Sequence, residues 1–411
     1  MKLHWKILIA MGLGVIVGFL YDNSLSQDNT FYDLIILLGD IFIRLLKMVI
    51  VPLVLTSIII GISSINDRAK IGRMGLKTLI YYISTSLIAI LIGLSLVNTI
   101  KPGEGATPIS GAEAYDSSQL QSTSIIDIFK RMVPENPIAA LASGDMLSII
   151  FFAIFFGLML NFIDTKHSKP ILGIVNSIYR IILKMTQIIL KTAPLGVFGL
   201  IVKAVSTSGL SIFKELGLYA ITLISGLSIH LFIVIPLILI LIVKVNPIKH
   251  FKAISSAMIT AFSTSSSSAT LPVTMKCVRD NVKVSGETSS FVLPMGATIN
   301  MDGTALYECV GVLFIAQAIG IPLDASQQFV VVITALLASI GAAGIPSAGT
   351  VMLFIVTEAV GLQSDVVAVW VGSMLAIDRP LDMFRTMVNV SSDSVGAAVI
   401  AKSEGEKLYS D

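Results

Sequence analysis

One apolar segment near the end of the sequence carries a row of polar residues whose spacing matches one face of a helix. Residues three and four positions apart are neighbours on a helix surface. A charge at the centre of a bilayer costs at least about 2.5–3.5 kcal/mol on insertion scales. An Asp382–Arg385 ion pair would account for only two members of the row. The row therefore predicts an aqueous cavity or polar ligands around Asp378, Asp382, Arg385, Thr386, Asn389 and Asp393.

A second polar interruption, residues 300–304 with the sequence Asn-Met-Asp-Gly-Thr, lies in the middle of the apolar segment 288–320. A helix broken there frees backbone carbonyl groups, and Asp302 adds a carboxylate. Oxygen ligands of this kind suit hard cations such as sodium. A kink stabilised by Asn300 is the alternative, but it would not require Asp302. Glu308, about one helical turn further on, is an acid at membrane depth and a candidate proton carrier.

Two further segments combine apolar flanks with residues that break helices. Residues 263–272 are rich in Ser and end in Pro272, and residues 339–349 are rich in Gly and contain Pro346. Non-helical backbone at membrane depth requires burial in protein or a cavity. Exposed loops are one interpretation. The other, which we favour, is a pair of re-entrant hairpins, the pattern of an inverted repeat with a binding site near the midplane.

The composition sets the class of protein in which these residues must be positioned. The chain has 411 residues, of which 55% are hydrophobic and only 13% are charged. Soluble domains carry about 25% charged residues, and disordered chains need low hydrophobicity, so both classes are excluded. The net charge of +2 gives no reason to expect a nucleic-acid partner. Two cysteines cannot build a disulfide framework. We expect an all-α polytopic membrane protein.

Eight apolar runs are long enough to cross about 30 Å of hydrocarbon. Lys and Arg concentrate in the loops 66–77, 244–252 and 276–283, which places these loops and both termini in the cytoplasm. The hairpin segments 255–285 and 329–368 must then return to the side from which they enter. The first run lacks a small-residue cleavage site, so we expect it to be retained. The expected spans are 5–21, 32–64, 74–99, 146–163, 173–205, 211–243, 288–320 and 370–400.

Three motifs resemble signatures of the glutamate transporter family, the dicarboxylate/amino acid:cation symporters. They are the sequences SSSATLPVTM at 266–275, NMDGT at 300–304 and DMFRTMVNV at 382–390. The resemblance covers essentially the whole chain, in order. It implies a homotrimer that moves its substrate by an elevator motion. A scaffold would comprise residues 1–68 and 101–205, and a mobile transport domain would comprise residues 69–100 and 206–411.

The resemblance also implies a binding site for L-aspartate or L-glutamate. Arg385 would bind the side-chain carboxylate and Asp382 the amino group, and a guanidinium fork suits a carboxylate well. Neutral amino acid carriers of the family lack the arginine, and C4-dicarboxylate carriers lack the amine-binding aspartate. The presence of both therefore favours an acidic amino acid. The other pocket residues would be Ser266, Ser267, Ser268, Thr304, Ile345, Gly349, Thr386 and Asn389.

Three sodium sites follow from the same resemblance. Ala342 replaces a threonine of archaeal relatives, a change that a backbone ligand tolerates. Met301, in the same interrupted segment as Asn300 and Asp302, is a further candidate sodium-site residue. One site would use Gly296, Asn300, Asn389 and Asp393; a second would use carbonyl groups of Thr298, Ser339, Ile340 and Ala342; a third would use Tyr82, Thr85, Ser86, Asn300 and Asp302.

Three positions, 265, 383 and 308, are informative about where this sequence stands within the family. Ser265 stands where archaeal relatives have an arginine, and Met383 where animal carriers have one, so Arg379 is the candidate replacement. Glu308 matches the acidic residue of proton-coupled members. Proton co-transport and potassium counter-transport are therefore hypotheses beside sodium coupling, and a proton-coupled, sodium-independent symporter is the alternative.

Two other classes fit the sequence less well. An intramembrane protease would need a motif such as GxGD or HExxH, and neither occurs in the chain. An ion channel would explain buried acids but not an arginine beside an acceptor for an amine.

Outer loops are short, and the one glycosylation sequon, at Asn389, lies inside a predicted span. We therefore expect a multi-pass protein of a prokaryotic inner (plasma) membrane.

Overall fold

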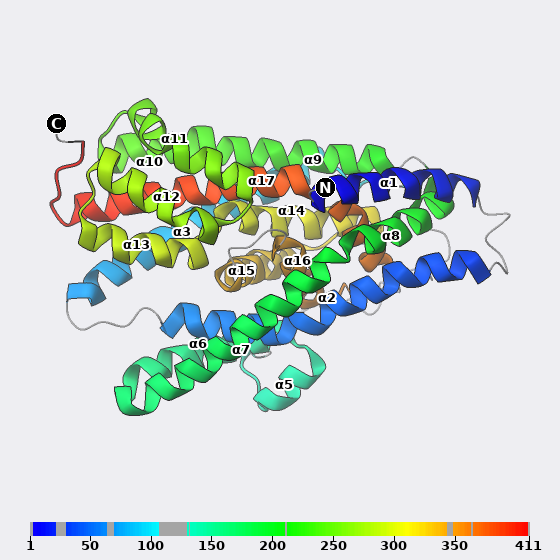
Figure 1. Cartoon of the computed structure of the whole chain (residues 1–411), viewed down its shortest axis with the longest axis horizontal. Coiled ribbons are helices and arrows are strands. Elements are labelled where there is room, and N and C mark those ends of the chain that lie inside the picture. The colour runs from blue at the N-terminus through cyan, green and yellow to red at the C-terminus, as the bar shows by residue number, and fades with distance from the viewer. Residues whose placement is uncertain are drawn as a thin grey trace.

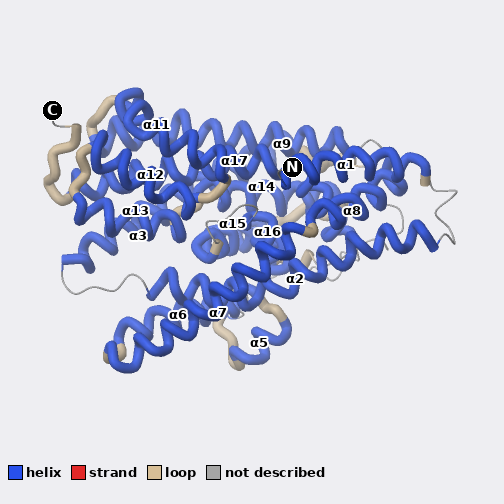
Figure 2. Tube along the Cα trace, viewed as in Figure 1, coloured by secondary structure: helices blue, strands red, loops and turns tan. Residues whose placement is uncertain are grey.

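The structure, a computed structural model, describes residues 3–21, 30–63, 70–106, 130, 132–209, 212–342, 348–362 and 365–409. Every regular element within these ranges is a helix (Figures 1 and 2). This is the expected outcome for apolar segments, because a helix pairs its own backbone N–H and C=O groups where water is absent. The all-α class predicted from composition is confirmed.

The described residues of the first half of the chain are mostly in long helices, with one short helix, α5. These are α1 (Leu3–Leu20), α2 (Thr30–Ser63), α3 (Lys70–Ile100), α5 (Pro137–Ser143), α6 (Met146–Phe162), α7 (Thr165–Lys191) and α8 (Ala193–Ser208).

The second half is more broken, and its described residues include three π-helical segments. It comprises α9 (Ile212–Ile229), η3 (His230–Val234), α10 (Ile235–Ile238), η4 (Leu239–Val243), α11 (Pro247–Thr264), α12 (Ser267–Cys277), η5 (Val278–Val282), α13 (Gly286–Ile299), α14 (Asp302–Ala318), α15 (Ala325–Gly341), α16 (Ala348–Ala359) and α17 (Asp365–Ser403).

Five helical stretches in the described ranges are both long and apolar enough to cross a membrane. The expected spans 5–21, 146–163 and 370–400 correspond to α1, α6 and α17. The single span expected at 173–205 is wrong, because α7 ends at Lys191 and α8 begins at Ala193. Pro194 lies in the first turn of α8, where its missing N–H cannot continue the hydrogen bonding of α7. The five stretches are Thr30–Ser63, Arg73–Ile100, Thr165–Lys191, Ile212–Val243 and Gly286–Ala318.

The two segments rich in Ser and Gly each form a pair of short packed helices. In the first pair, α11 packs against α12, and Ser265 turns the chain in a left-handed conformation with φ 52°. The Oγ atom of Ser266 then accepts a hydrogen bond from Ala269 N at 3.1 Å and caps α12. In the second pair, α15 packs against α16, and residues 343–347 between them lie outside the described residues.

Packing divides the helices into two sets. The most extensive contacts of α1, α2, α6 and α7 are made within the set formed by these helices and α8. The helices α3, α9, α11–α13, α15 and α16 instead surround α14 and α17, which lie at the centre of their own set (Figure 1). The helices that carry the polar stripe and the Asn-Met-Asp-Gly-Thr interruption are therefore both enclosed by protein.

Candidate functional site

The polar stripe of α17 faces the protein interior. Its members Asp378, Asp382, Arg385, Asn389 and Asp393 are each no more than 5% exposed. The neighbouring helices α13 and α14 pack along α17 and bring the interrupted segment 300–304 against it. Burial among polar partners rather than lipid agrees with the cost of placing charges in hydrocarbon.

Arg385 is the centre of a buried charge cluster. Its Nη1 atom donates to Asp378 Oδ1 at 2.8 Å, and its Nη2 atom donates to Asp382 Oδ1 at 2.9 Å. The ring of Tyr307 lies over the guanidinium, with 3.7 Å between Cζ and the ring centroid. Aromatic stacking of this kind suits a guanidinium. The sequence stripe included Asp378 without assigning it a role, and Tyr307 was not predicted at all.

A second arginine lies near the same carboxylate. Arg379 Nη1 is 3.7 Å from Asp382 Oδ2, and the Arg379 side chain is 27% exposed. Arg379, the candidate replacement for the arginine that is absent at positions 265 and 383, therefore lies within ion-pair distance of Asp382. It lies at the edge of the buried cluster.

The other predicted pocket residues are distributed around Arg385. Thr386 Oγ1 donates to the Asp382 carbonyl at 2.8 Å. Asn389 Oδ1 accepts from Gly303 N at 2.8 Å, and Asn389 Nδ2 donates to Thr304 Oγ1 at 3.2 Å. A Cβ atom on Gly349 would lie 3.3 Å from Arg385 Nη2, so the α16 backbone closely approaches the guanidinium.

The remaining predicted pocket residues belong to the two hairpins. Ser266, Ser267 and Ser268 lie at the start of α12, which packs against α17. Ile345 lies outside the described residues.

Asp302 joins three helices in a buried polar cluster. Its Oδ1 atom accepts a hydrogen bond from Ser86 Oγ at 2.7 Å, and its Oδ2 atom lies 3.0 Å from His230 Nε2. Nearby, Thr85 Oγ1 donates to Asn300 Oδ1 at 3.4 Å. Four of the residues predicted for the third sodium site, Thr85, Ser86, Asn300 and Asp302, are thus brought together.

His230 was missed by the sequence prediction. It is fully buried in the π-helix η3, in the middle of an apolar span. A lone ionisable residue within such a span is itself a signal of function, and π-helical turns often occur at functional sites. These two signals could have identified it.

The residues predicted for the first sodium site also meet. Asn300 Nδ2 donates to Asp393 Oδ1 at 2.9 Å. A Cβ atom on Gly296 would lie 2.5 Å from Asp393 Oδ1 and 2.7 Å from Tyr82 Oη, so this position requires glycine for the close approach. Asn389 is instead directed at Gly303 and Thr304.

In the Asp302 and Asp393 clusters, the atoms that could coordinate a cation are mainly carboxylate, amide and hydroxyl oxygens. Backbone carbonyl groups where α13 ends before α14 could add to them. The Asp302 cluster also contains the imidazole of His230. Within the described ranges, no three His, Cys, Asp or Glu side chains gather as a metal-binding group. Oxygen donors of this kind suit a hard cation such as sodium.

The residues predicted for the second sodium site lie at a cavity between helices. Thr298, Ile340 and Ala342 line a space of about 350 Å³ beside α2 and α7. Ala342 N donates to the Ser339 carbonyl at 3.2 Å, and Ser339 itself is fully buried. The three lining residues come from α13 and from the end of α15.

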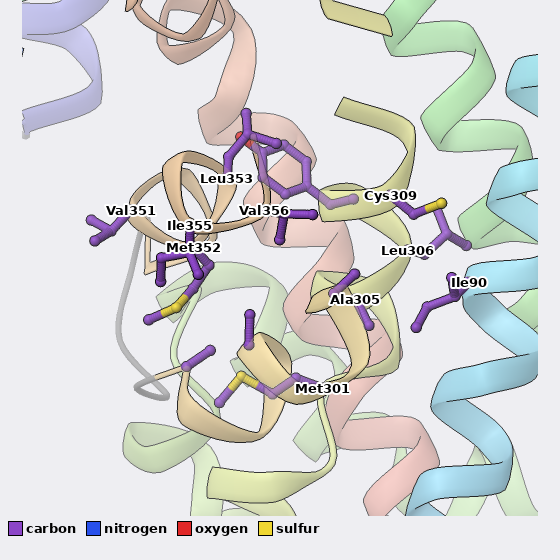
Figure 3. Close-up of a cluster of buried hydrophobic side chains, with 14 of the residues drawn as sticks. Ile90, Met301, Ala305, Leu306, Cys309, Val351, Met352, Leu353, Ile355 and Val356 are labelled. Atoms are coloured by element: carbon purple, nitrogen blue, oxygen red, sulfur yellow. The ribbon is translucent and has the colours of Figure 1, made fainter. Parts of the chain in front are cut away.

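Glu308 differs from the other buried acids. It is fully buried, and neither carboxylate oxygen has a hydrogen-bond partner among the described residues. Figure 3 shows apolar side chains around this part of α14, including Ile90, Leu306 and Leu353. An unpaired charge is very costly in such surroundings, and the group is expected to be neutral and protonated.

The fold and the site together define a class of protein. Paired short helices, a broken helix and a buried cluster of paired charges inside a helical membrane protein are the features of a secondary transporter. The chain belongs to the sodium:dicarboxylate symporter family, whose model matches residues 3–403. The family resemblance of the three motifs is thereby confirmed, and the protein is a transporter rather than an enzyme.

Curated relatives are similar over nearly the whole chain. The excitatory amino acid transporters 3 of Oryctolagus cuniculus and Homo sapiens are each 34% identical, over 99% of this chain and 87% of the relative. The proton/glutamate-aspartate symporter of Escherichia coli (strain K12) is 35% identical, over 98% of this chain and 93% of the relative. The protein is therefore similar both to animal carriers and to a bacterial carrier named for proton coupling.

Proposed function

We propose that this protein is a secondary active symporter of L-aspartate or L-glutamate. The observation that carries the proposal is the buried Arg385, which has Asp382 on one nitrogen and Asp378 on the other. An arginine supplies the planar donor fork that a substrate carboxylate needs, and an aspartate supplies the acceptor for an ammonium group. The relatives named for glutamate, aspartate or excitatory amino acids support the same substrate class.

The geometry suggests how the substrate enters the charge cluster. Without substrate, Asp382 occupies Arg385 Nη2, while Arg385 Nε has no partner among the described residues. A substrate side-chain carboxylate would take the place of Asp382 on the guanidinium. Asp382 would then bind the substrate ammonium through the oxygen released by Arg385, with Arg379 still near its other oxygen. One exchange of partners would pair both charged groups of the substrate. Gly349 and Thr386 would lie at the edges of the bound molecule.

A competition assay tests the substrate class. The purified protein is reconstituted in proteoliposomes. Uptake of external labelled L-aspartate is measured in the presence of unlabelled L-glutamate, succinate or L-serine. We expect the two acidic amino acids to compete and the other two compounds to fail. Succinate lacks the ammonium for Asp382, and serine lacks the carboxylate for Arg385. If succinate competes as well as L-glutamate does, Asp382 does not select for the ammonium group. If L-serine competes as well as L-glutamate does, Arg385 does not select for the side-chain carboxylate.

For the driving ion, we propose sodium, bound at the Asp302 and Asp393 clusters. A proton-coupled, sodium-independent mechanism is the second candidate, favoured by the buried and unpartnered Glu308. In that mechanism Glu308 would carry the proton, and potassium counter-transport is an accompanying hypothesis. The two candidates differ in which substitution abolishes ion coupling. Sodium coupling would depend on Asp302 and Asp393, and proton coupling would depend on Glu308.

A Glu308→Gln substitution separates these candidates. Glutamine keeps the shape and removes the titrating proton, so a proton-carrying role predicts loss of the pH dependence of uptake with transport of substrate retained. Uptake is measured across a range of external pH values, with internal acidification followed by a trapped dye. Cys309→Ser, a change at the adjacent buried position, is the control. A variant that still acidifies the lumen would exclude Glu308 as the proton carrier.

We further propose the assembly and topology expected for the family. Helices α1, α2 and α5–α8 would form the scaffold of a homotrimer, and the set around α14 and α17 would move as the transport domain. In support, α7 exposes a row of isoleucines, with Ile174 and Ile181 each at least 60% exposed, a surface suited to lipid or another copy. Both termini would lie in the cytoplasm of a prokaryotic cell.

A further inference from the structure

The chain folds back after α17, and residues 404–409 run across the ends of several other helices. Figure 1 shows this red segment at the same end of the molecule as α11, α12 and α13. The reversal begins at Gly405, whose φ of 84° is readily adopted only by glycine. We call residues 404–409 the tail strap.

Tyr409 connects the two arms of the first hairpin. Its N–H donates to the Val282 carbonyl at 2.9 Å, at the end of η5, where a helical carbonyl lacks an intrahelical partner. Its hydroxyl lies 2.5 Å from His250 Nδ1 in the first turn of α11, and Lys249 Nζ lies 5.1 Å from the ring centroid. His250 is fully buried, and its Nε2 atom is 3.0 Å from Ser394 Oγ of α17.

The two glutamates of the strap reach further helices. Glu406 accepts hydrogen bonds from Ser285 N, Ser285 Oγ and Thr288 Oγ1 at 2.7, 2.8 and 2.5 Å, which places an anion at the start of α13, where the helix dipole favours it. Glu404 binds Arg73 and Lys77 of α3. Hydrogen bonds from these two cations lower the pKa of Glu404. One strap thus contacts α3, α11, η5 and α13.

The backbone of Tyr409 supports a fixed position for the strap. Its φ of 56° is in the left-handed region, which is uncommon for a large side chain. Such a conformation persists only where the surroundings determine it. Here the hydrogen bonds to Val282 and His250 and the contact with Lys249 determine it.

From these contacts we propose that Tyr409 is a positioning residue for the substrate-binding end of the first hairpin. The arms α11 and α12–η5 meet at the serine-containing tip, and at the other end Asn281 Nδ2 donates to the Ala253 carbonyl at 2.7 Å. Tyr409 adds a second link between the arms at this end, through Val282 and His250. This second link makes the hairpin a more rigid unit on α17, against which both α11 and α12 pack, so that the serine-containing tip is held at a defined place along α17. The transport readout of this proposal rests on the proposed function, but its structural readout does not.

The proposal is tested with Tyr409→Ala, Tyr409→Phe and the control Lys407→Ala, which alters an exposed side chain of the same strap. Hydrogen exchange of the full-length protein should accelerate about tenfold at residues 247–252 and 278–285 in Tyr409→Ala. Exchange should accelerate less in Tyr409→Phe, which loses only the hydroxyl contact, and stay unchanged in Lys407→Ala. The KM for L-aspartate should rise about fivefold in Tyr409→Ala while Vmax stays nearly constant.

Unchanged exchange at both arms in Tyr409→Ala would overturn the proposal. A fall in Vmax with unchanged KM would also overturn it, because that result indicates loss of folded protein alone. If Tyr409→Ala does not fold, Tyr409→Phe decides the question: exchange at residues 247–252 faster than in both wild type and Lys407→Ala supports the proposal, and exchange equal to both overturns it. If the wild-type protein fails to transport L-aspartate, the proposed function is wrong, and hydrogen exchange alone decides the role of the strap.

Discussion

Replacing Arg385 by alanine should abolish uptake of acidic amino acids. The change removes the donor fork and leaves Asp378 and Asp382 buried beside each other without their counterion. Truncating one partner of a buried, hydrogen-bonded charge pair between two binding partners costs about 2–5 kcal/mol, and each 1.4 kcal/mol is a factor of ten in affinity. We therefore expect uptake of labelled L-aspartate to fall at least about 100-fold in proteoliposomes, while transport of neutral amino acids can persist.

Two companion variants make the Arg385 result specific. Arg385→Lys keeps the charge but loses the planar fork, so it should retain a small part of the uptake. Arg180→Ala removes an exposed arginine of α7 and should behave as wild type. Unchanged L-aspartate uptake in Arg385→Ala, with normal protein levels, would contradict the assignment of the binding site.

Asp302→Asn should produce the second large effect, on ion coupling. Asp302 is the carboxylate that Ser86 and His230 both contact, and asparagine keeps its shape while removing its negative charge. A cation bound there would lose its principal counter-charge, so the sodium concentration for half-maximal uptake should rise at least about tenfold. Uptake is measured across a series of external sodium concentrations at constant ionic strength.

Asp280→Asn is the matched control for this variant, because Asp280 is exposed at the end of the first hairpin and should not affect sodium dependence. His230→Gln can be tested in the same series to show whether the imidazole contributes to the ion site. A wild-type sodium dependence in Asp302→Asn would exclude this cluster as a coupling site.

The sequence predicted those elements whose signals are local. Apolar length indicated most spans, and the Asn-Met-Asp-Gly-Thr sequence marks the break between α13 and α14. Only Asn300 and Met301 are non-helical there, and α14 begins at Asp302. The break between α7 and α8 was missed although Pro194 marks it, because the surrounding residues remain apolar and continue the hydrophobic pattern.

The pairings within the site could not be read from sequence spacing. Asp378 and Asp382 share one helix face with Arg385, so their proximity was predictable. Tyr307 stacks on Arg385 from α14, and His230 reaches Asp302 from η3. Both contacts depend on how separate helices pack. The tail strap likewise joins Tyr409 to His250, residues far apart in the chain, and nothing in either local sequence specifies the partner.

The central claim, that cation gradients drive uptake of an acidic amino acid through this pocket, is tested most directly by labelled L-aspartate uptake into proteoliposomes. Sodium and pH gradients are imposed separately, with equal salt on both sides in the pH experiment. We predict uptake that requires external sodium. Uptake driven by a proton gradient in the absence of sodium would contradict the sodium sites at Asp302 and Asp393 and favour the mechanism through Glu308. Absence of L-aspartate uptake under every gradient would contradict the proposed function itself.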